Sequence, residues 1–158
     1  MSEVARIGSQ LKRAVEGGAW HGPALLELLA DVSAERAAAR PIPDAHSIWE
    51  IVLHVAAWQS FAAEAVEGGS MPVDLADEAN WPPVSDAGDA AWRAAVEGVG
   101  IADRRLRDAL RKFSDEDLER IVPGREYDFY FLLHGVVQHG LYHAGQVALL
   151  KKARTENL

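Results

Sequence analysis

Cysteine is absent from this chain of 158 residues. Disulfide scaffolds, thiolate zinc sites, iron–sulfur clusters and cysteine nucleophiles are therefore excluded. Basic residues are also few, because 16 Lys and Arg stand against 24 Asp and Glu, which gives a formal net charge of −8. Proteins that bind nucleic acids gather Lys and Arg on one face to displace counterions from phosphates. We therefore expect no nucleic-acid partner.

The first residues lack the apolar segment of a secretory signal peptide, so we expect a cytoplasmic protein. Charged residues are absent from residues 129–150, a stretch long enough to span a bilayer. This stretch nevertheless contains His134, His139, His143 and two glutamines, each of which is costly in hydrocarbon. We interpret it as a helix buried inside a protein and expect no association with a membrane.

Strand-like alternation of apolar and polar residues is missing, and apolar residues recur at helical spacing instead. The length fits a single domain over residues 1–158. Ser47 and Glu50 form a capping-box pattern before one helix, and Asp128 can cap the last one. Four main helices are predicted, over residues 4–15, 48–66, 87–113 and 129–153, with short helical turns after Pro23 and Ser114.

The connection between the second and third main helices, residues 68–86, is long and rich in Gly, Pro and Asp. Antiparallel neighbours need only a short loop. About 20 residues of extended chain reach up to about 65 Å, which exceeds the length of a 20-residue helix. The connection therefore permits a crossover between parallel helices. We predict an all-α four-helix bundle with a long crossover between its second and third helices.

His139 and His143 are four residues apart on the last predicted helix, so both rings can point at one centre. Imidazole pairs at this spacing suit zinc, nickel, copper or iron, although two buried histidines can also be satisfied by hydrogen bonds alone. Five polar residues share one arc of this uncharged helix: Gln138, His139, Tyr142, His143 and Gln146. Buried polar groups need partners, and this requirement favours a metal ion.

The best candidate for a third ligand is His54, which lies in an apolar run of the second main helix. His134 faces away from the other pair on the last helix, and His21 and His46 lie outside the regular helices. Glu50, His54 and Glu64 also fall on one arc and could instead form a solvated stripe. The spacing alone leaves this alternative open.

No catalytic residue is assigned from the sequence. Glu50 is a possible general base near His54, but its place in the capping box is the better explanation. Tyr142 could donate a hydrogen bond at the site and Trp58 could wall it, although residues of these types at such positions more often pack in the core. Trp81 could cover the site, and an anchor for the connection is an equally good explanation of it. Candidates for hydrogen-bond partners of the histidine rings are Gln138, Glu50 and Gln146.

Two segments of the chain resemble a known family. Residues 47–58, with His54 inside them, are similar to the second-helix motif of the DinB/YfiT-like superfamily. Residues 134–146 are similar to its last-helix motif, in the spacing of His139 and His143 and in the positions of Tyr142 and the glycines. Weaker similarity extends to residues 19–23 and 80–82. The chain therefore resembles that superfamily over nearly its whole length.

The resemblance implies a four-helix bundle with a crossover, in which His54, His139 and His143 hold a divalent metal ion. Members commonly form homodimers and are described as metal-dependent hydrolases. Their relatives include bacillithiol-dependent transferases and mycothiol-dependent isomerases, whose extra segments and cofactor-binding residues are not matched here. The outer stripe of the uncharged last helix needs a cover, which a homodimer interface or the long crossover folded across it could provide, and we predict the dimer.

We therefore expect a divalent-metal protein, with zinc or nickel as the ion. Its predicted activity is that of a hydrolase or a thiol-dependent S-transferase acting on a small electrophilic molecule. Any thiol would be an external low-molecular-weight one, because the chain has no cysteine. Two alternatives stay open: a metal-braced or ligand-sensing module without catalysis, and a metal-free helical interaction protein. A water-filled open metal position would favour catalysis over bracing.

Overall fold

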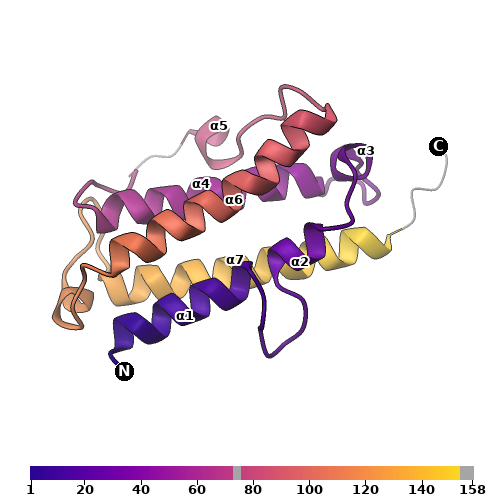
Figure 1. Cartoon of the computed structure of the whole chain (residues 1–158). Helices are drawn as coiled ribbons and strands as arrows, with labels where there is room; N and C mark the ends of the chain where they lie inside the picture. The colour runs from indigo at the N-terminus through magenta and orange to yellow at the C-terminus, as the bar shows by residue number, and fades with distance from the viewer. Residues whose placement is uncertain (73–75, 154–158) are drawn as a thin grey trace.

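The computed structural model describes residues 1–72 and 76–153, and in these ranges it contains helices and a single isolated bridge between Ile121 and Asp128. The predicted all-helical class is thereby confirmed for the described residues (Figure 1). In chain order the elements are α1 (Glu3–Val15), α2 (Leu25–Leu29), α3 (Ala34–Ala38), α4 (Ile48–Val66), α5 (Asp77–Asn80), α6 (Asp89–Leu110), the 3₁₀ turn η1 (Glu116–Glu119) and α7 (Phe129–Lys152).

The four longest helices pack against one another in a closed arrangement. α4 packs on α6 and α7, and α1 packs on the same two helices from the other side. Figure 1 shows that α4 and α6 run in one direction and that α1 and α7 run in the opposite one. α5 lies between α4 and α6 in the chain and packs against α4.

The caps predicted from the sequence are present. The Ser47 hydroxyl accepts from the Glu50 amide, and the Glu50 carboxylate accepts from the Ser47 amide at 2.8 Å. Asp128 accepts from the Phe131 amide at 2.8 Å and begins α7. These interactions satisfy amide groups that a helix start otherwise leaves unpaired. They explain why the bounds of α4 and the start of α7 were predictable.

The third main helix is shorter than predicted at both ends. The Asp86 side chain accepts from the Gly88 amide at 2.8 Å and holds a turn there, so α6 begins at Asp89. After Leu110 the chain leaves the helix, and the Ser114 amide donates to the Asp117 side chain instead. Side chains of Asp and Ser compete with helical hydrogen bonds in this way. The short helices α3 and α5 were not predicted, because too few residues carry a periodic pattern.

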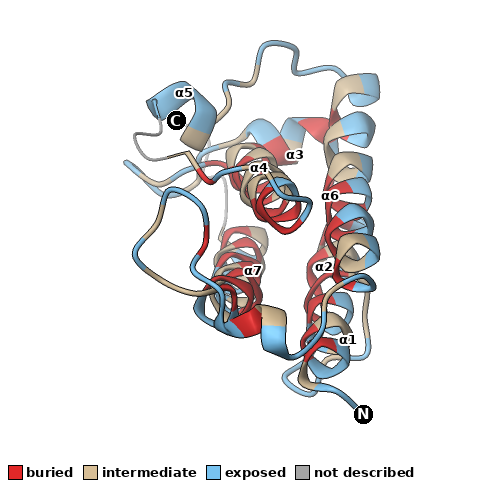
Figure 2. Ribbon diagram, turned by 90° about the vertical axis from the view of Figure 1, so that its left-hand side faces the viewer, coloured by how far each residue is buried: buried red, intermediate tan, exposed pale blue. Residues whose placement is uncertain are grey.

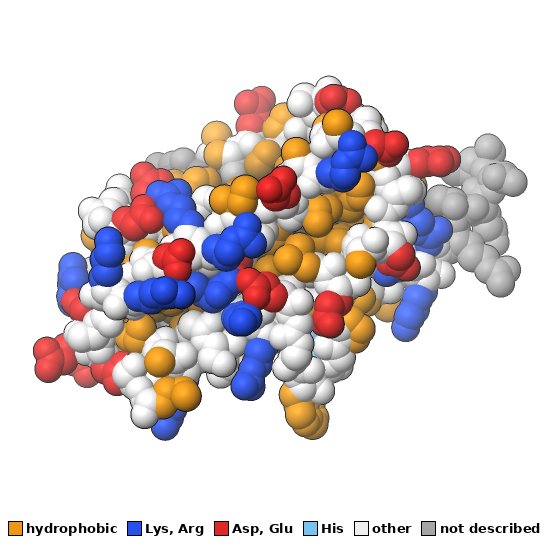
Figure 3. Space-filling model, viewed as in Figure 1, with side chains coloured by type: hydrophobic (Ala, Val, Ile, Leu, Met, Phe, Trp, Pro, Cys, Tyr) orange, Lys and Arg blue, Asp and Glu red, His pale blue; other side chains and the backbone are white. Residues whose placement is uncertain are grey.

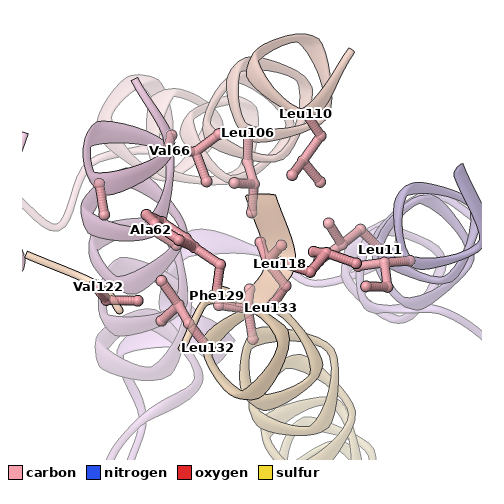
Figure 4. Packing of buried hydrophobic residues seen from close by; sticks show 14 of the residues in the cluster. Leu11, Ala62, Val66, Leu106, Leu110, Leu118, Val122, Phe129, Leu132 and Leu133 are labelled. Atoms are coloured by element: carbon pink, nitrogen blue, oxygen red, sulfur yellow. The ribbon is translucent and has the colours of Figure 1, made fainter. Parts of the chain in front are cut away.

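The apolar core consists of two clusters along the bundle, made by the buried faces that Figure 2 shows on the long helices. In one cluster Phe129 and Leu133 of α7 meet Leu11 and Leu106 (Figure 4). In the other, Trp49 packs near Trp92, and the Trp92 indole donates to the Val32 carbonyl at 2.7 Å. Burying each such large side chain contributes about 1.5–3 kcal/mol to folding.

Charged side chains of both signs are mixed on the face shown in Figure 3. One ion-pair cluster reaches inside, where Arg107 of α6 pairs with the fully buried Asp103 at 2.7 Å and with Glu16 beyond α1. Within residues 1–72 and 76–153, none of the helices is both long and apolar enough to cross a membrane.

Candidate metal centre

Three histidine rings converge between α4 and α7. His54 lies in the second turn of α4, and His139 and His143 lie one turn apart in the middle of α7. The His139 Nε2 atom is 2.9 Å from His54 Nε2 and 3.0 Å from His143 Nε2. The alternative in which His54 belongs to a solvated stripe is wrong, because the His54 side chain is buried at 6% exposure.

The outer ring nitrogens fix the protonation of two of these histidines. His54 Nδ1 lies 2.6 Å from the Asn80 carbonyl oxygen, and His143 Nδ1 lies 2.6 Å from Gln146 Oε1. Both oxygens can only accept, so each Nδ1 carries the proton and donates it. The Nε2 atoms of His54 and His143 therefore present lone pairs toward His139.

Hydrogen bonds within the protein cannot satisfy this arrangement. A neutral His139 ring can donate from Nε2 to only one of the two lone pairs that face it. The contact to the other histidine then brings two lone pairs together at about 3 Å. A cation among the three nitrogens removes the repulsion. The ligand nitrogens of a tetrahedral ion, at about 2.0–2.1 Å from it, lie about 3.3–3.4 Å apart, so a small adjustment of the rings would admit the ion. The donor set therefore fits a first-row divalent metal ion.

The electrostatics also suit a metal. The pKa of His139 is lowered to about 3, first by burial and then by the neighbouring His143 and His54 rings. Burial is likewise the main cause that lowers the pKa of His143 to about 4, and it lowers the pKa of His54. All three rings are therefore neutral at pH 7. Metal binding requires this state, because a protonated ring cannot be a ligand.

The connection between α4 and α6 covers one side of the centre. The Trp81 indole stacks on the His54 ring at 3.8 Å between centroids and 8° between planes. On its other face the indole stacks on His46 at 3.5 Å between centroids. His46, which the sequence did not assign to the site, therefore helps to hold Trp81 over His54. The Trp58 indole donates to the Asn80 side chain at 3.0 Å. These contacts fix Asn80, whose carbonyl orients His54.

A cavity of about 270 Å³ opens beside the cluster. His54 and His139 form one end of it, and the described part of its lining contains no Lys, Arg, Asp or Glu. The lining residues are His54, Trp58, Asn80, Tyr127, Phe131, Leu132, Gly135, Val136 and His139. An ion at the histidines would therefore be accessible to a small molecule.

Comparison with known protein families identifies the family of this chain. The family model of the DinB superfamily matches residues 19–147, which include the three histidines and the covering connection. This chain belongs to the DinB superfamily. The resemblance seen in the two histidine-containing motifs is confirmed. Comparisons with curated proteins and with solved structures gave no match.

The other candidate residues of this DinB superfamily member fall into two groups. Gln146 contacts the His143 ring, as anticipated for one of three candidates. Glu50 is occupied by its capping interaction and by Arg40, outside the histidine cluster. Gln138 is exposed and does not line the cavity, so it contributes nothing to the centre in the described structure. Tyr142 is 65% exposed and does not line the cavity either, but its hydroxyl accepts from Gln146 Nε2 at 3.3 Å, so it reaches the centre through the partner of His143.

The sequence missed Asn80 as the partner of His54. The contact uses a main-chain carbonyl, which every residue type possesses, so no side-chain pattern identifies it. The nearby Trp81 was the available signal, because an aromatic residue beside prolines in a polar connection is typical of a segment anchored on the fold. The contact between the Asn80 carbonyl and His54, one residue before Trp81, depends on how the connection folds back over α4.

Proposed function

We propose that this protein binds a divalent ion, zinc or nickel, through His54, His139 and His143 and uses it in reactions of small electrophilic molecules. The observation that carries this proposal is the convergence of three neutral imidazoles. The His139 Nε2 atom lies 2.9 Å from His54 Nε2 and 3.0 Å from His143 Nε2, and the rings carry too few protons for both contacts to be hydrogen bonds. The proposal includes the architecture, a DinB-type four-helix bundle of α1, α4, α6 and α7 whose α4–α6 connection is the crossover.

The open side of the centre supports a reactive role over bracing. Structural zinc sites fill four positions with protein ligands. Among the described residues the group consists of three histidines, with no fourth His, Cys or carboxylate. Two of the three rings, those of His54 and His139, line the cavity. A divalent ion in such a site lowers the pKa of a water or thiol that reaches it and so supplies a nucleophile at neutral pH.

Within this proposal, transfer of an external thiol is favoured over hydrolysis. Hydrolytic metal sites commonly pair the ion with a carboxylate that acts as general base. The described lining of the cavity has no carboxylate, and Glu50 is held in its cap. A thiol needs no such base if its proton ends on the product. With an epoxide, sulfur bonds to a ring carbon, the carbon–oxygen bond breaks, and the thiol proton ends on the oxygen.

Metal content tests the ligand assignment. We expect about one zinc or nickel ion per chain in the wild type and less than about a tenth of that in His54→Ala and His143→Ala, because two imidazoles hold a metal weakly. His134→Ala is the control, since it removes a histidine of the same helix outside the cluster. Equal metal content in all four proteins by elemental analysis would refute the three-histidine site.

Activity is tested separately on the loaded protein. Consumption of a low-molecular-weight thiol in the presence of an epoxide is expected to require the metal and to be abolished in His139→Ala. Release of product from ester or amide substrates without a thiol would favour hydrolysis instead. A loaded protein with neither activity would favour a ligand-sensing module.

The proposed assembly is a homodimer formed through the outer stripe of α7. Tyr142 and Leu149 lie on one side of this helix and are 65% and 66% exposed. The described part of the α4–α6 connection covers the histidine side of the molecule and leaves this stripe open. Analytical ultracentrifugation of wild type and Leu149→Glu is the test, and a monomeric wild type at all concentrations would remove the proposal.

A further inference from the structure

The cavity beside the histidines has a distinct shape and chemistry. Phe131, Gly135 and His139 lie at successive turns of α7 and all line it. Eight residues of helix measure about 12 Å, so this wall leads from an aromatic end to the histidine end over that length. The rings of Tyr127 and Phe131 are 5.1 Å apart, and Phe131 is 65% exposed, which places this pair at the solvent end.

The walls between these ends are apolar. Trp58 of α4 and Val136 of α7 line the cavity, and the Trp58 ring lies 6.0 Å from the His139 ring. The indole N–H of Trp58 is already bound to Asn80. Aromatic walls with their polar atoms occupied favour a flat apolar group over a charged or sugar-like one.

The size of the cavity limits the guest. A dry cavity of about 150 Å³ accommodates benzene. A volume of about 270 Å³ therefore suits one aromatic ring with a short linker. A ring lying against Trp58 and Val136 would leave its linker directed at the histidine end.

Gly135 keeps this space open. A Cβ atom built on Gly135 meets no heavy atom within 4 Å, so a side chain there would enter open space along the cavity wall. Glycine inside a helix costs about 1 kcal/mol relative to alanine, so helix stability does not explain it. Gly145 of the same helix is equally unobstructed, but it is exposed and lies outside the cavity lining.

From these features we infer that the substrate is an uncharged molecule with a single aromatic ring, separated by one to three bonds from the group that reaches the histidine centre. Gly135 is the residue that determines this specificity. The inference rests on the proposed function for the reacting group, while the ring-binding part depends only on the cavity.

Two thiols that differ in the ring provide the first test. Benzyl mercaptan and ethanethiol are titrated into zinc-loaded wild type, Gly135→Leu and Gly145→Leu, with calorimetry for affinity and NMR of the indole N–H groups for location. The Trp58 signal is assigned with Trp58→Phe. We expect wild type and Gly145→Leu to bind benzyl mercaptan at least about tenfold more tightly than ethanethiol, because burial of a ring contributes that much.

Gly135→Leu is expected to reduce this ratio to about twofold or less while it retains its zinc and melts at or above the temperature of the wild type. A Trp58 signal that shifts with benzyl mercaptan in wild type and stays unchanged in Gly135→Leu would support the assignment. Equal affinities of the two thiols in wild type, no binding of either, or an undiminished preference in Gly135→Leu would overturn it.

A second arm separates this inference from the proposed function. If wild type retains no zinc, the metal proposal fails, and toluene is titrated into the metal-free protein instead. A shift of the Trp58 signal in wild type and Gly145→Leu, lost in Gly135→Leu, supports the aromatic cavity on its own. No shift in wild type overturns it.

Discussion

Two polar clusters are buried between the long helices, and they differ in whether the chain supplies the opposite charge. In the first, Arg107 lies between Asp103 and Glu16 and donates to both carboxylates. In the second, three neutral imidazoles face one another with too few protons to pair. The first cluster contains opposite charges and holds α6 to the end of α1. In the second cluster, neutral rings turn their lone pairs toward one another, so a cation placed among them would remove the repulsion.

The comparison shows how a structural cluster differs from a binding one. Burial raises the pKa of Asp103 even with the Arg107 guanidinium beside it, so the cost of burying that carboxylate is only partly offset. Nevertheless its counter-charge is part of the chain. The histidines avoid the free-energy cost of burying a charge because they stay neutral, and their lone pairs remain available to a cation. A buried polar group whose complement is missing from the chain is a candidate site for a ligand.

The largest expected effect comes from breaking the first cluster. Arg107→Leu leaves the fully buried Asp103 without its counter-charge, and we expect a loss of about 3–5 kcal/mol in the free energy of unfolding. Arg111→Leu is the matched control, because Arg111 pairs with Asp108 in solvent and should change stability by less than about 0.5 kcal/mol. Urea denaturation measures both. Similar losses in the two variants would contradict the distinction.

A smaller effect is expected from the ring partners of the second cluster. Gln146→Leu removes the acceptor that orients His143, and zinc affinity should fall about tenfold or more, which is at least about 1.4 kcal/mol. Competition with a chromophoric chelator measures it. Gln138→Leu changes an exposed glutamine of the same helix and should bind zinc like the wild type. If both variants lost affinity equally, Gln146 would have no specific role.

The smallest effect concerns the pH dependence of the metal-free protein. In the unfolded chain histidines gain protons below pH 6.5, whereas in the folded protein the pKa of His139 is about 3 and that of His143 about 4. The unfolded state therefore binds more protons in this window, and the free energy of unfolding decreases as the pH falls. Full stability from these groups is present above pH 6.5.

Comparison with His139→Gln isolates one ring. Between pH 6.5 and about pH 5, the variant should lose about 1 kcal/mol less stability than wild type, a value kept small because residual solvent access screens the group. Asp103 contributes equally to both proteins and cancels. Urea titrations at the two pH values measure the difference, and identical slopes would show that His139 titrates normally in the fold.

The helix bounds illustrate what local sequence could predict. Ser47 and Asp128 cap helices through contacts within three residues, so α4 and α7 were predictable at their starts. Asp86 and Ser114 also act locally, but their competition with helical hydrogen bonds left the ends of α6 uncertain. For the site, the spacing of His139 and His143 follows from helix geometry, whereas His54 was reached by elimination.

The sequence by itself determined that this protein is helical, that it belongs with the DinB superfamily and that histidine, not cysteine, is available as a metal ligand. Those properties follow from periodicity, from two short motifs and from the absence of cysteine. Only the tertiary structure decided that the Asn80 carbonyl orients His54, that Trp81 stacks between His46 and His54, and that a cavity ends at the centre. These contacts join segments far apart in the chain, and no local pattern encodes the distance between them.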